Sequence, residues 1–318
     1  MAAQPACRGR RGRGDGGGGA PRSVTRRALC IVNPAAGKRT ANEDDLARAL
    51  AIVRDASFAL EVRETAAEKP SAADLARAAV VEGFDAVIAC GGDGTVQPVA
   101  HALLGTDVVL GILPFGTYMN VANGLGLPLE PIPAARVIAR GRVVAVDVGA
   151  VAGKHFLETA GIGIDAELFG AARLAERGRW GRALRRLWRG ITQSSYVLDL
   201  VVDGTPHRHR AYQALVANSP YYLWAFHVSP DSRMDDGYLD VAVYARMRRR
   251  ELAAAVLGFL LSGSYARSPV SYRGKRIELS AERPLPVHAD GQLVARTPAT
   301  FECVRGALRV FAAGSSPT

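Results

Sequence analysis

The first half of the chain alternates short apolar runs with stretches of helical periodicity. The apolar runs have the length of buried strands and occupy residues 28–32, 59–65, 86–90 and 108–113. After the first run, apolar side chains recur at helical spacing at Leu46, Leu50 and Val53. Strand, loop and helix in alternation predict a parallel sheet with helices on its faces.

Local signals place the ends of two helices. Asn42 is suited to cap the first helix, whose opening turn carries three acids that the helix dipole favours, Glu43, Asp44 and Asp45. Ser71, with Asp74 three residues later, predicts a capping box that opens a second helix, and Gly83 predicts its end.

The pattern changes at about Val143. Strand-like runs then follow with few helices between them, at 143–148, 196–202, 212–217, 239–244, 276–279 and 307–311. This succession predicts a second, mostly antiparallel domain, interrupted by helical stretches at about 166–191 and 247–262. We therefore expect a basic leader over 1–27, an α/β domain over 28–142, a β-rich domain over 143–313 whose last strand can return to the first domain, and a tail over 314–318.

Composition narrows the classes of partner. The 318 residues carry 40 Lys and Arg against 30 Asp and Glu, a net charge of +10, which favours nucleotides, nucleic acid or an acidic membrane surface. The four cysteines are far apart, which argues against a zinc site or a disulfide framework and favours a reducing cytoplasm. No apolar stretch approaches the roughly 20 residues of a spanning helix. The Arg- and Gly-rich leader is either a basic arm that contacts phosphates or a disordered segment without function.

The strongest chemical signal is the loop Gly91-Gly92-Asp93-Gly94-Thr95, which directly follows the third predicted strand. Glycines let the backbone turn several N–H groups toward an anion, and the helix that follows points its positive end the same way. Two more loops follow strands of the same sheet, from Asn33 to Lys38 and at Gly116-Thr117. Because the carboxyl ends of parallel strands meet at one edge, we expect the three loops to converge on an anionic ligand.

Residues 161–166 match the dinucleotide pattern G-x-G-x-x-A, yet they do not predict a dinucleotide site. Such a site needs an acid about 20 residues later, and residues 184–188 contain two arginines and no acid.

Taken together, these blocks resemble the diacylglycerol kinase catalytic domain family, which includes sphingosine and ceramide kinases and the bacterial YegS/DgkB-like lipid kinases. The resemblance covers about 28–313 and also rests on Gly126-Leu127-Pro128, 161–167, 231–237 and 289–291. It implies an α/β domain similar to phosphofructokinase and NAD kinase, followed by an antiparallel β-sandwich.

The resemblance also implies roles for individual residues. Asp93 and Asp290 are the expected catalytic carboxylates, with Asp290 as the general base, and ATP and Mg²⁺ are the expected cofactors. Asp236 would hold Mg²⁺ together with backbone groups of its neighbours Arg233 and Tyr238. ATP would contact Asn33, Lys38, Thr65, Gly91, Gly92, Asp93, Gly94, Thr95, Val96, Gln97, Gly116 and Thr117. Judged by the residues alone, Asp290-Gly291 is typical of a hairpin turn.

Several positions depart from the family pattern. Gln97-Pro98 stands where many members carry Asn-Glu, Asn120 ends a segment that is often x-Asn-Asp, and Gln292 replaces a frequent glutamate. Fewer acids around the site would change metal use or turnover more than nucleotide binding.

Residues 171–191 combine seven arginines with tryptophans and leucines at helical spacing. A cationic helix with an aromatic face is typical of a helix that lies on an acidic membrane, although a solvated helix packed on its own domain has the same pattern.

Four functions are compatible with these features. The first is a cytoplasmic, peripherally membrane-associated lipid kinase that phosphorylates a hydroxyl of diacylglycerol or a sphingoid base. The others are a small-molecule kinase similar to NAD kinase, a non-catalytic nucleotide-binding protein at the membrane, and a nucleic-acid binder. The last rests on charge alone and lacks interleaved aromatic residues, so we expect no specific nucleic-acid partner. The sequence does not determine the oligomeric state.

Overall fold

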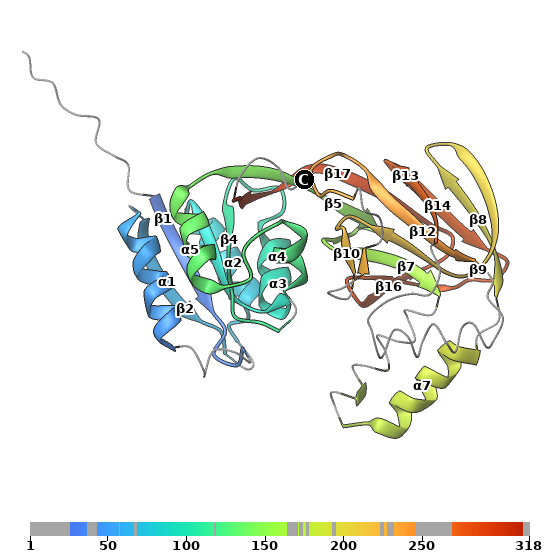
Figure 1. The fold of residues 1–318 in the computed structure, drawn as a ribbon, viewed down its shortest axis with the longest axis horizontal. Coiled ribbons are helices and arrows are strands. Elements are labelled where there is room, and N and C mark those ends of the chain that lie inside the picture. Colours follow the sequence, from blue (N-terminus) through green and yellow to red (C-terminus); the bar gives the residue numbers. More distant parts are fainter. Residues whose placement is uncertain are drawn as a thin grey trace, which may run out of the picture.

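The structure is a computed structural model, shown in Figure 1. It describes residues 26–36, 43–56, 58–66, 69–117, 119–163, 171, 174–175, 178–192, 195–222, 226–227, 232–245 and 269–313. Lys38, most of the leader, the predicted helix at 247–262 and the tail lie outside these residues.

The first domain is built on a four-stranded parallel sheet in the order β4-β3-β1-β2. Its strands are β1 (Arg26–Val32), β2 (Phe58–Glu64), β3 (Ala86–Gly91) and β4 (Val109–Pro114). Its helices are α1 (Glu43–Asp55), α2 (Ala72–Val81), α3 (Asp93–Leu103), α4 (Asn120–Gly124) and α5 (Pro131–Arg140).

Helices cover both faces of this sheet because the chain reverses direction across it. From β1 the chain moves outward to β2, and it then passes back over β1 to β3 and β4. Right-handed crossovers therefore place α1 on one face and α2 with α3 on the other. The packing agrees, since α1 contacts α5 and α2 contacts α3.

The second domain is an antiparallel β structure, as predicted (Figure 1). Its elements are β5 (Val143–Val151), β6 (Lys154–Phe156), β7 (Thr159–Gly163), α7 (Trp180–Thr192), β8 (Tyr196–Val202), β9 (Thr205–Ala217), β10 (Tyr221–Tyr222), β11 (Phe226–His227), β12 (Leu239–Ala245), β13 (Val270–Gly274), β14 (Arg276–Ala281), β15 (Pro286–Ala289), β16 (Gln292–Arg296) and β17 (Ala299–Phe311).

Strand β17 belongs to both domains. Its first residues pair with β14, and at its far end Val310 lies beside Leu110 of β4 in parallel register. Strand β5 runs antiparallel along β17 on both sides of an irregularity between Val304 and Leu308. Two long strands thus connect the domains, which otherwise have separate hydrophobic cores.

The predicted strands and helices are present where the structure describes them, most of them with different ends, and the structure adds several short strands and the helices α4 and α5. Strand β1 begins at Arg26, so the last two residues assigned to the leader belong to the sheet. Arg27 is held there because its backbone N–H donates to Asp85 at 2.7 Å and its guanidinium lies 4.3 Å from the Phe84 ring centre. The predicted capping box of α2 is present: Asp74 N–H donates to the Ser71 hydroxyl at 3.2 Å, and Ser71 N–H donates back to Asp74 at 3.1 Å.

The rejected dinucleotide motif lies in β7. Gly161 and Gly163 are paired there with Leu215 and Gln213 of β9 in an antiparallel ladder. The glycines of the motif are thus strand residues of an antiparallel ladder, which agrees with its rejection, and its last three residues lie outside the described residues.

Candidate active site

The carboxyl ends of β1 and β3 mark the point where the strand order of the first sheet reverses. Open α/β sheets bind ligands at such a point. Asn33 follows β1 here, and its side-chain amide donates to the Thr95 hydroxyl at 3.1 Å. Its backbone N–H also donates to the carbonyl of Cys90 at 3.1 Å. These bonds join the first predicted loop to the glycine loop after β3.

The glycine loop packs directly on the loop after β4. A Cβ added to Gly116 would lie 2.3 Å from the Cα of Gly92, so position 116 has no room for a side chain. A Cβ added to Gly92 would make a tight contact of 3.1 Å with the Cα of Gly116, whereas a Cβ at Gly94 would meet no atom within 4 Å. Protein packing therefore requires glycine at 116, and Gly94 borders open space where a ligand can approach the backbone.

Helix α3 begins within this loop, at Asp93, and its cap residue Gly92 has no side chain. The N–H groups of Thr95 and Val96 donate to the carbonyl of Gly92 at 2.8 Å and 3.0 Å, whereas the first two N–H groups of a helix, here those of Asp93 and Gly94, have no carbonyl partner within it. Pro98 lies inside the helix and removes the N–H that would bond to the carbonyl of Gly94. Thr95 and Val96 are buried as whole residues, so they shape the loop from inside and Gly94 is the position that faces open space.

Asp93 connects the glycine loop to α4. Its carboxylate accepts the backbone N–H groups of Asn120 at 3.1 Å and Val121 at 3.3 Å. Burial raises its pKa, and these N–H groups act in the opposite direction. Asp93 thus caps a short helix and fixes the two loops relative to each other.

The other residues of the first domain that were predicted to contact ATP either follow strands at the same edge of the sheet or lie outside the described residues. Thr65 follows β2, and its N–H donates to the carbonyl of Val32 at 2.9 Å. Thr117 follows Gly116 in the loop after β4.

Asp290 occupies the hairpin turn between β15 and β16, as its local sequence predicts. Asp290 and Gly291 both have positive φ, 42° and 69°, as a two-residue type I′ turn requires. Its carboxylate points back into the domain and accepts the backbone N–H groups of Leu157 at 2.7 Å, Glu158 at 3.0 Å and Thr159 at 3.1 Å. Burial raises the pKa of Asp290 to about 6, although the three N–H groups favour the charged form. A carboxylate offers about four lone-pair sites, so one acceptor site is left for another donor.

Glu158 is a site residue that the sequence analysis missed. The amide of Gln97 on α3 donates to its carboxylate at 2.6 Å. Burial, together with the negative charges of Asp290 and Asp93, raises the pKa of Glu158 to about 8. Its sequence signal was a single acid inside the apolar stretch from Phe156 to Ile162.

These contacts bring both predicted catalytic carboxylates into electrostatic reach of one group, Glu158. His101 of α3 also approaches Asp290, with 3.9 Å between Nε2 and Oδ2. Burial lowers the pKa of His101, and His155 lowers it further, so the imidazole is neutral near pH 7. The site is therefore formed by both domains.

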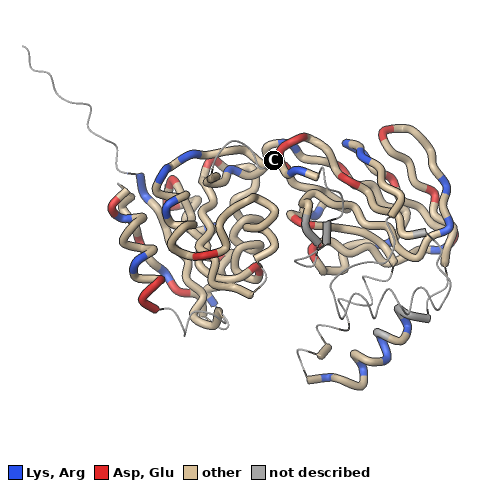
Figure 2. Tube along the Cα trace, viewed as in Figure 1, with Lys and Arg blue, Asp and Glu red and all other residues tan. Residues whose placement is uncertain are grey.

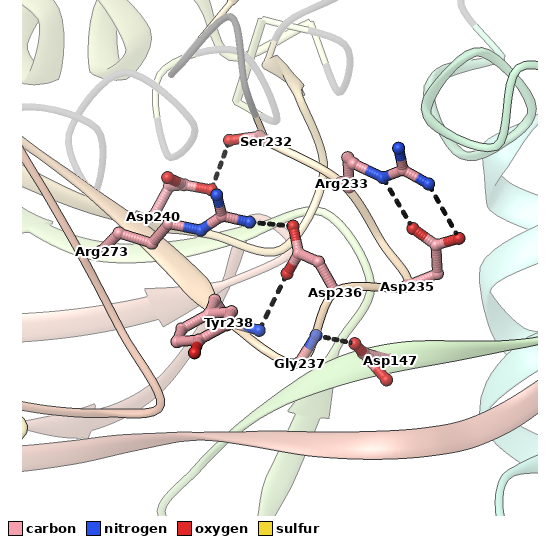
Figure 3. Close-up of polar contacts among 9 residues, drawn as sticks. All are labelled: Asp147, Ser232, Arg233, Asp235, Asp236, Gly237, Tyr238, Asp240 and Arg273. Carbon is pink, nitrogen blue, oxygen red and sulfur yellow. Dashed lines mark hydrogen bonds and ion pairs between the residues drawn. The ribbon is translucent and has the colours of Figure 1, made fainter. Parts of the chain in front are cut away.

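Asp236, the predicted metal ligand, lies in a loop before β12 that is rich in charge (Figure 3). Its carboxylate accepts the N–H of Tyr238 at 2.9 Å and pairs with Arg273. Arg233 is turned toward Asp235, with 3.0 Å between its Nε and a carboxylate oxygen.

Asp147 of β5 supports this loop from below and was also missed by the sequence analysis. One of its carboxylate oxygens accepts the N–H of Gly237 at 2.6 Å (Figure 3). The other accepts the N–H of Gly306 at 2.7 Å. Its sequence signal was an acid within the alternating strand pattern 143–151.

The Asp236 loop provides donors that suit a hard cation, but only one of them is a carboxylate. Backbone oxygens of Arg233 and Tyr238 are the other expected ligands, and oxygen donors are what Mg²⁺ prefers. Burial raises the pKa of Asp236, and Asp147 and Asp235 contribute to the rise, so the surroundings favour a positive partner. Within the described ranges, no cluster of three or more His, Cys, Asp or Glu side chains is arranged to hold a metal ion.

Comparison with known proteins agrees with this geometry. The model of the diacylglycerol kinase catalytic domain matches residues 27–151, and that of the YegS C-terminal NAD kinase beta sandwich-like domain matches 165–312. The chain is 31% identical over 295 residues to a protein of Pseudomonas aeruginosa (strain UCBPP-PA14) named "Probable lipid kinase YegS-like", covering 88% of this chain and 93% of that one. This chain belongs to the diacylglycerol kinase-like family of lipid kinases.

Other relatives of this family cover nearly the same span. The diacylglycerol kinase of Bacillus subtilis (strain 168) is 25% identical over 285 residues, which are 87% of this chain and 93% of that one. A crystal structure of a diacylglycerol kinase from Bacillus anthracis str. Sterne shows the same fold, with a TM-score of 0.71 at 23% identity over 92% of this chain and 98% of that one. Membership in the family implies use of ATP and of a lipid substrate.

Helix α7 exposes large apolar side chains. Trp180, Leu184 and Trp188 lie four residues apart and are 70%, 68% and 66% exposed, whereas Ala183 is buried. Figure 2 shows basic residues along the same helix, and they include the exposed Arg182, Arg185 and Arg189. None of the described helices is long and apolar enough to cross a membrane.

Proposed function

We propose that this chain transfers the γ-phosphate of ATP to a hydroxyl group of a membrane lipid such as diacylglycerol or a sphingoid base. The observation that carries the proposal is the placement of Asp290, a buried carboxylate with a pKa near 6, against helix α3: the glycine loop opens this helix, and His101 in its last turn lies 3.9 Å from Asp290. Phosphoryl transfer needs a positioned nucleotide and a carboxylate that accepts the proton of the attacking hydroxyl.

ATP binds at the switch point of the first sheet. The N–H groups at the start of α3 and the open space beside Gly94 suit its phosphates, and the positive end of the helix dipole adds to the attraction. Asn33 joins the site through its bond to Thr95, Thr117 follows the Gly116 that packs on Gly92, and Lys38 would add a cation from the first loop.

Asp290 acts as the general base. A pKa near 6 leaves it mostly ionised at neutral pH while keeping it basic enough to accept a proton. The three backbone N–H groups hold the carboxylate in one orientation, with its remaining acceptor site available to the substrate hydroxyl.

The Asp236 loop would hold Mg²⁺, which would supply positive charge to the β-rich side of the site. Asp236 and the backbone oxygens of Arg233 and Tyr238 would hold it, and the ion would replace the guanidinium of Arg273 as the partner of Asp236.

Helix α7 brings the enzyme to an acidic membrane, where the lipid substrate lies. Exposed tryptophans beside an arginine stripe are typical of a helix that lies in the membrane interface. Each arginine close to acidic lipid contributes about 1 kcal/mol of attraction.

The deciding experiment follows labelled phosphate from γ-labelled ATP. The purified protein is offered a mixed-lipid extract in detergent micelles, with NAD in the aqueous phase. Label in the organic phase is the expected result, and the labelled lipid then identifies the acceptor. Label on NADP in the aqueous phase would instead indicate a small-molecule kinase. ATP binding without any transfer would contradict the proposal and indicate a nucleotide-binding protein without turnover.

A further inference from the structure

We propose that Glu158 is a positioning residue of the site: as a neutral acid it joins Gln97 on α3 to the Asp290 hairpin and keeps Asp290 as the ionised partner of the pair. The inference rests on the proposed phosphoryl transfer and adds a residue to which no role has been assigned.

The contacts of Glu158 link three separate segments. Its carboxylate accepts the amide of Gln97 from the first domain at 2.6 Å, and its backbone N–H donates to Asp290 at 3.0 Å. Its carbonyl accepts the N–H groups of Asn218 at 2.9 Å and Ser219 at 3.2 Å. The backbone of this buried residue therefore holds the second domain together, and its carboxylate adds the bond to Gln97 of the first domain.

Two of its partners lie at unusual positions of the chain. The side chains of Gln97 and Asn120 both favour the charged form of Glu158 by hydrogen bonding. These are positions where the sequence departs from the family pattern. The departures therefore converge on Glu158, which lies between them and Asp290.

The charges around Glu158 decide which carboxyl keeps a proton. Asp93 on α3 and Asp290 on the hairpin face it with negative charge, and burial penalises a further charge, so its pKa lies near 8. Asp290 has a pKa near 6 because three N–H groups offset part of its burial. Between these values the two groups share one proton, which resides on Glu158.

The histidines nearby do not change this order. His101 on α3 is neutral near pH 7, because burial and His155 of β6 lower its pKa. His288 of β15 faces Asp290 and favours the ionised form of that carboxylate.

Ionising Glu158 would harm the reaction in two ways. A third negative charge beside Asp93 and Asp290 would raise the pKa of Asp290. It would also repel the phosphates of ATP at the opening of α3. We therefore expect phosphate transfer to decline as the pH rises through about 8.

The test compares the pH profiles of kcat for wild type, Glu158→Gln and Glu158→Ala, with ATP and diacylglycerol in mixed micelles. The glutamine variant cannot ionise, so it should lose the decline near pH 8 and keep the decline near pH 6. The alanine variant leaves Gln97 without its partner and should lower kcat by about 10²-fold. Glu278→Gln, on the exposed surface of β14, is the control and should leave the profile unchanged. An unchanged alkaline limb in Glu158→Gln would overturn the proposal.

A second measurement does not depend on kinase activity. The infrared difference spectrum between wild type and Glu158→Gln should contain the C=O band of a protonated carboxyl at pH 7, and the band should disappear above pH 8. If the band is present but no lipid is phosphorylated, the protonation of Glu158 holds and the proposed kinase function fails. Absence of the band at pH 7 would show that Glu158 is ionised and would overturn the inference directly.

Discussion

The side-chain amide of Gln97 donates to the carboxylate of Glu158 over 2.6 Å and thereby joins helix α3 of the α/β domain to the segment that precedes β7. In the same segment, the backbone N–H groups of Glu158 and Thr159 donate to the carboxylate of Asp290. The general base of the proposed reaction is thus positioned relative to the nucleotide loop through one buried glutamate.

Replacing the base tests its role most directly. Asp290→Asn should keep ATP binding, measured by calorimetry, and lower phosphate transfer by about 10²–10⁴-fold, the usual contribution of a general base. Asp203→Asn is a matched control, because Asp203 also opens an Asp-Gly hairpin turn and its carboxylate also accepts backbone N–H groups, from Lys275 and Arg276. Near-normal turnover in Asp290→Asn would remove this residue from the base role.

Activity and stability should respond to pH in opposite directions. Protonation of Asp290 should reduce transfer as the pH falls through about 6. Its pKa is raised above the unfolded value of 3.8, so its contribution to stability is fully present below pH 3.8 and is lost as the pH rises through about 6. The loss is on the order of 3 kcal/mol. Thermal unfolding of wild type between pH 4 and 8 should therefore show a falling Tm, with a shallower slope in Asp290→Asn. Equal slopes in the two proteins would argue against a raised pKa.

The capping box of α2 offers a change in stability without a change in chemistry. Ser71→Ala removes the hydroxyl that accepts the N–H of Asp74, and it should lower the free energy of unfolding by about 1 kcal/mol. Urea unfolding measures this loss. Phosphate transfer should remain at the wild-type level below the unfolding transition, and a large loss of transfer would place α2 closer to the site than its position indicates.

Exposed side chains of α7 should govern membrane binding. Trp180→Ala combined with Leu184→Ala should weaken sedimentation with vesicles that contain anionic lipid, while Tm stays unchanged because both side chains are exposed. Arg182→Gln combined with Arg185→Gln should cost about 2 kcal/mol of binding and reduce its dependence on salt. Val81→Ala, at an 88% exposed position on α2, is the control for loss of an exposed apolar side chain. Wild-type binding by all of these variants would exclude α7 as the membrane contact.

The neighbouring carboxylates of the Asp236 loop allow a paired test of the metal proposal. Mg²⁺ should raise the Tm of wild type. It should also raise the Tm of Asp235→Asn, because the carboxylate removed there pairs with Arg233 and is not a proposed ligand. The same addition should have little effect on Asp236→Asn, because the proposed carboxylate ligand is lost. A Mg²⁺-dependent rise of the same size in all three proteins would place the ion elsewhere.

Local sequence patterns predicted the parallel sheet, the capping box and the antiparallel character of the second domain, but β9 and β17 begin seven and eight residues before their predicted starts at 212 and 307. The short strands β6, β7, β10, β11, β13, β15 and β16 were missed because runs of two to five residues carry too little periodicity to be distinguished from loops. The glycine loop was placed correctly after β3, since its signal lies within five consecutive residues.

Within this protein, the sequence alone determined what depends on near neighbours. The alternation of strands and helices, the cap at Ser71 and the Asp-Gly turn at Asp290 follow from residues a few positions apart. The tertiary structure decided which acids meet: Glu158 contacts Gln97 across 61 residues, and Asp290 accepts the N–H of Leu157 across 133. Burial of those acids sets their protonation, and burial depends on how the two domains pack, which no local pattern contains.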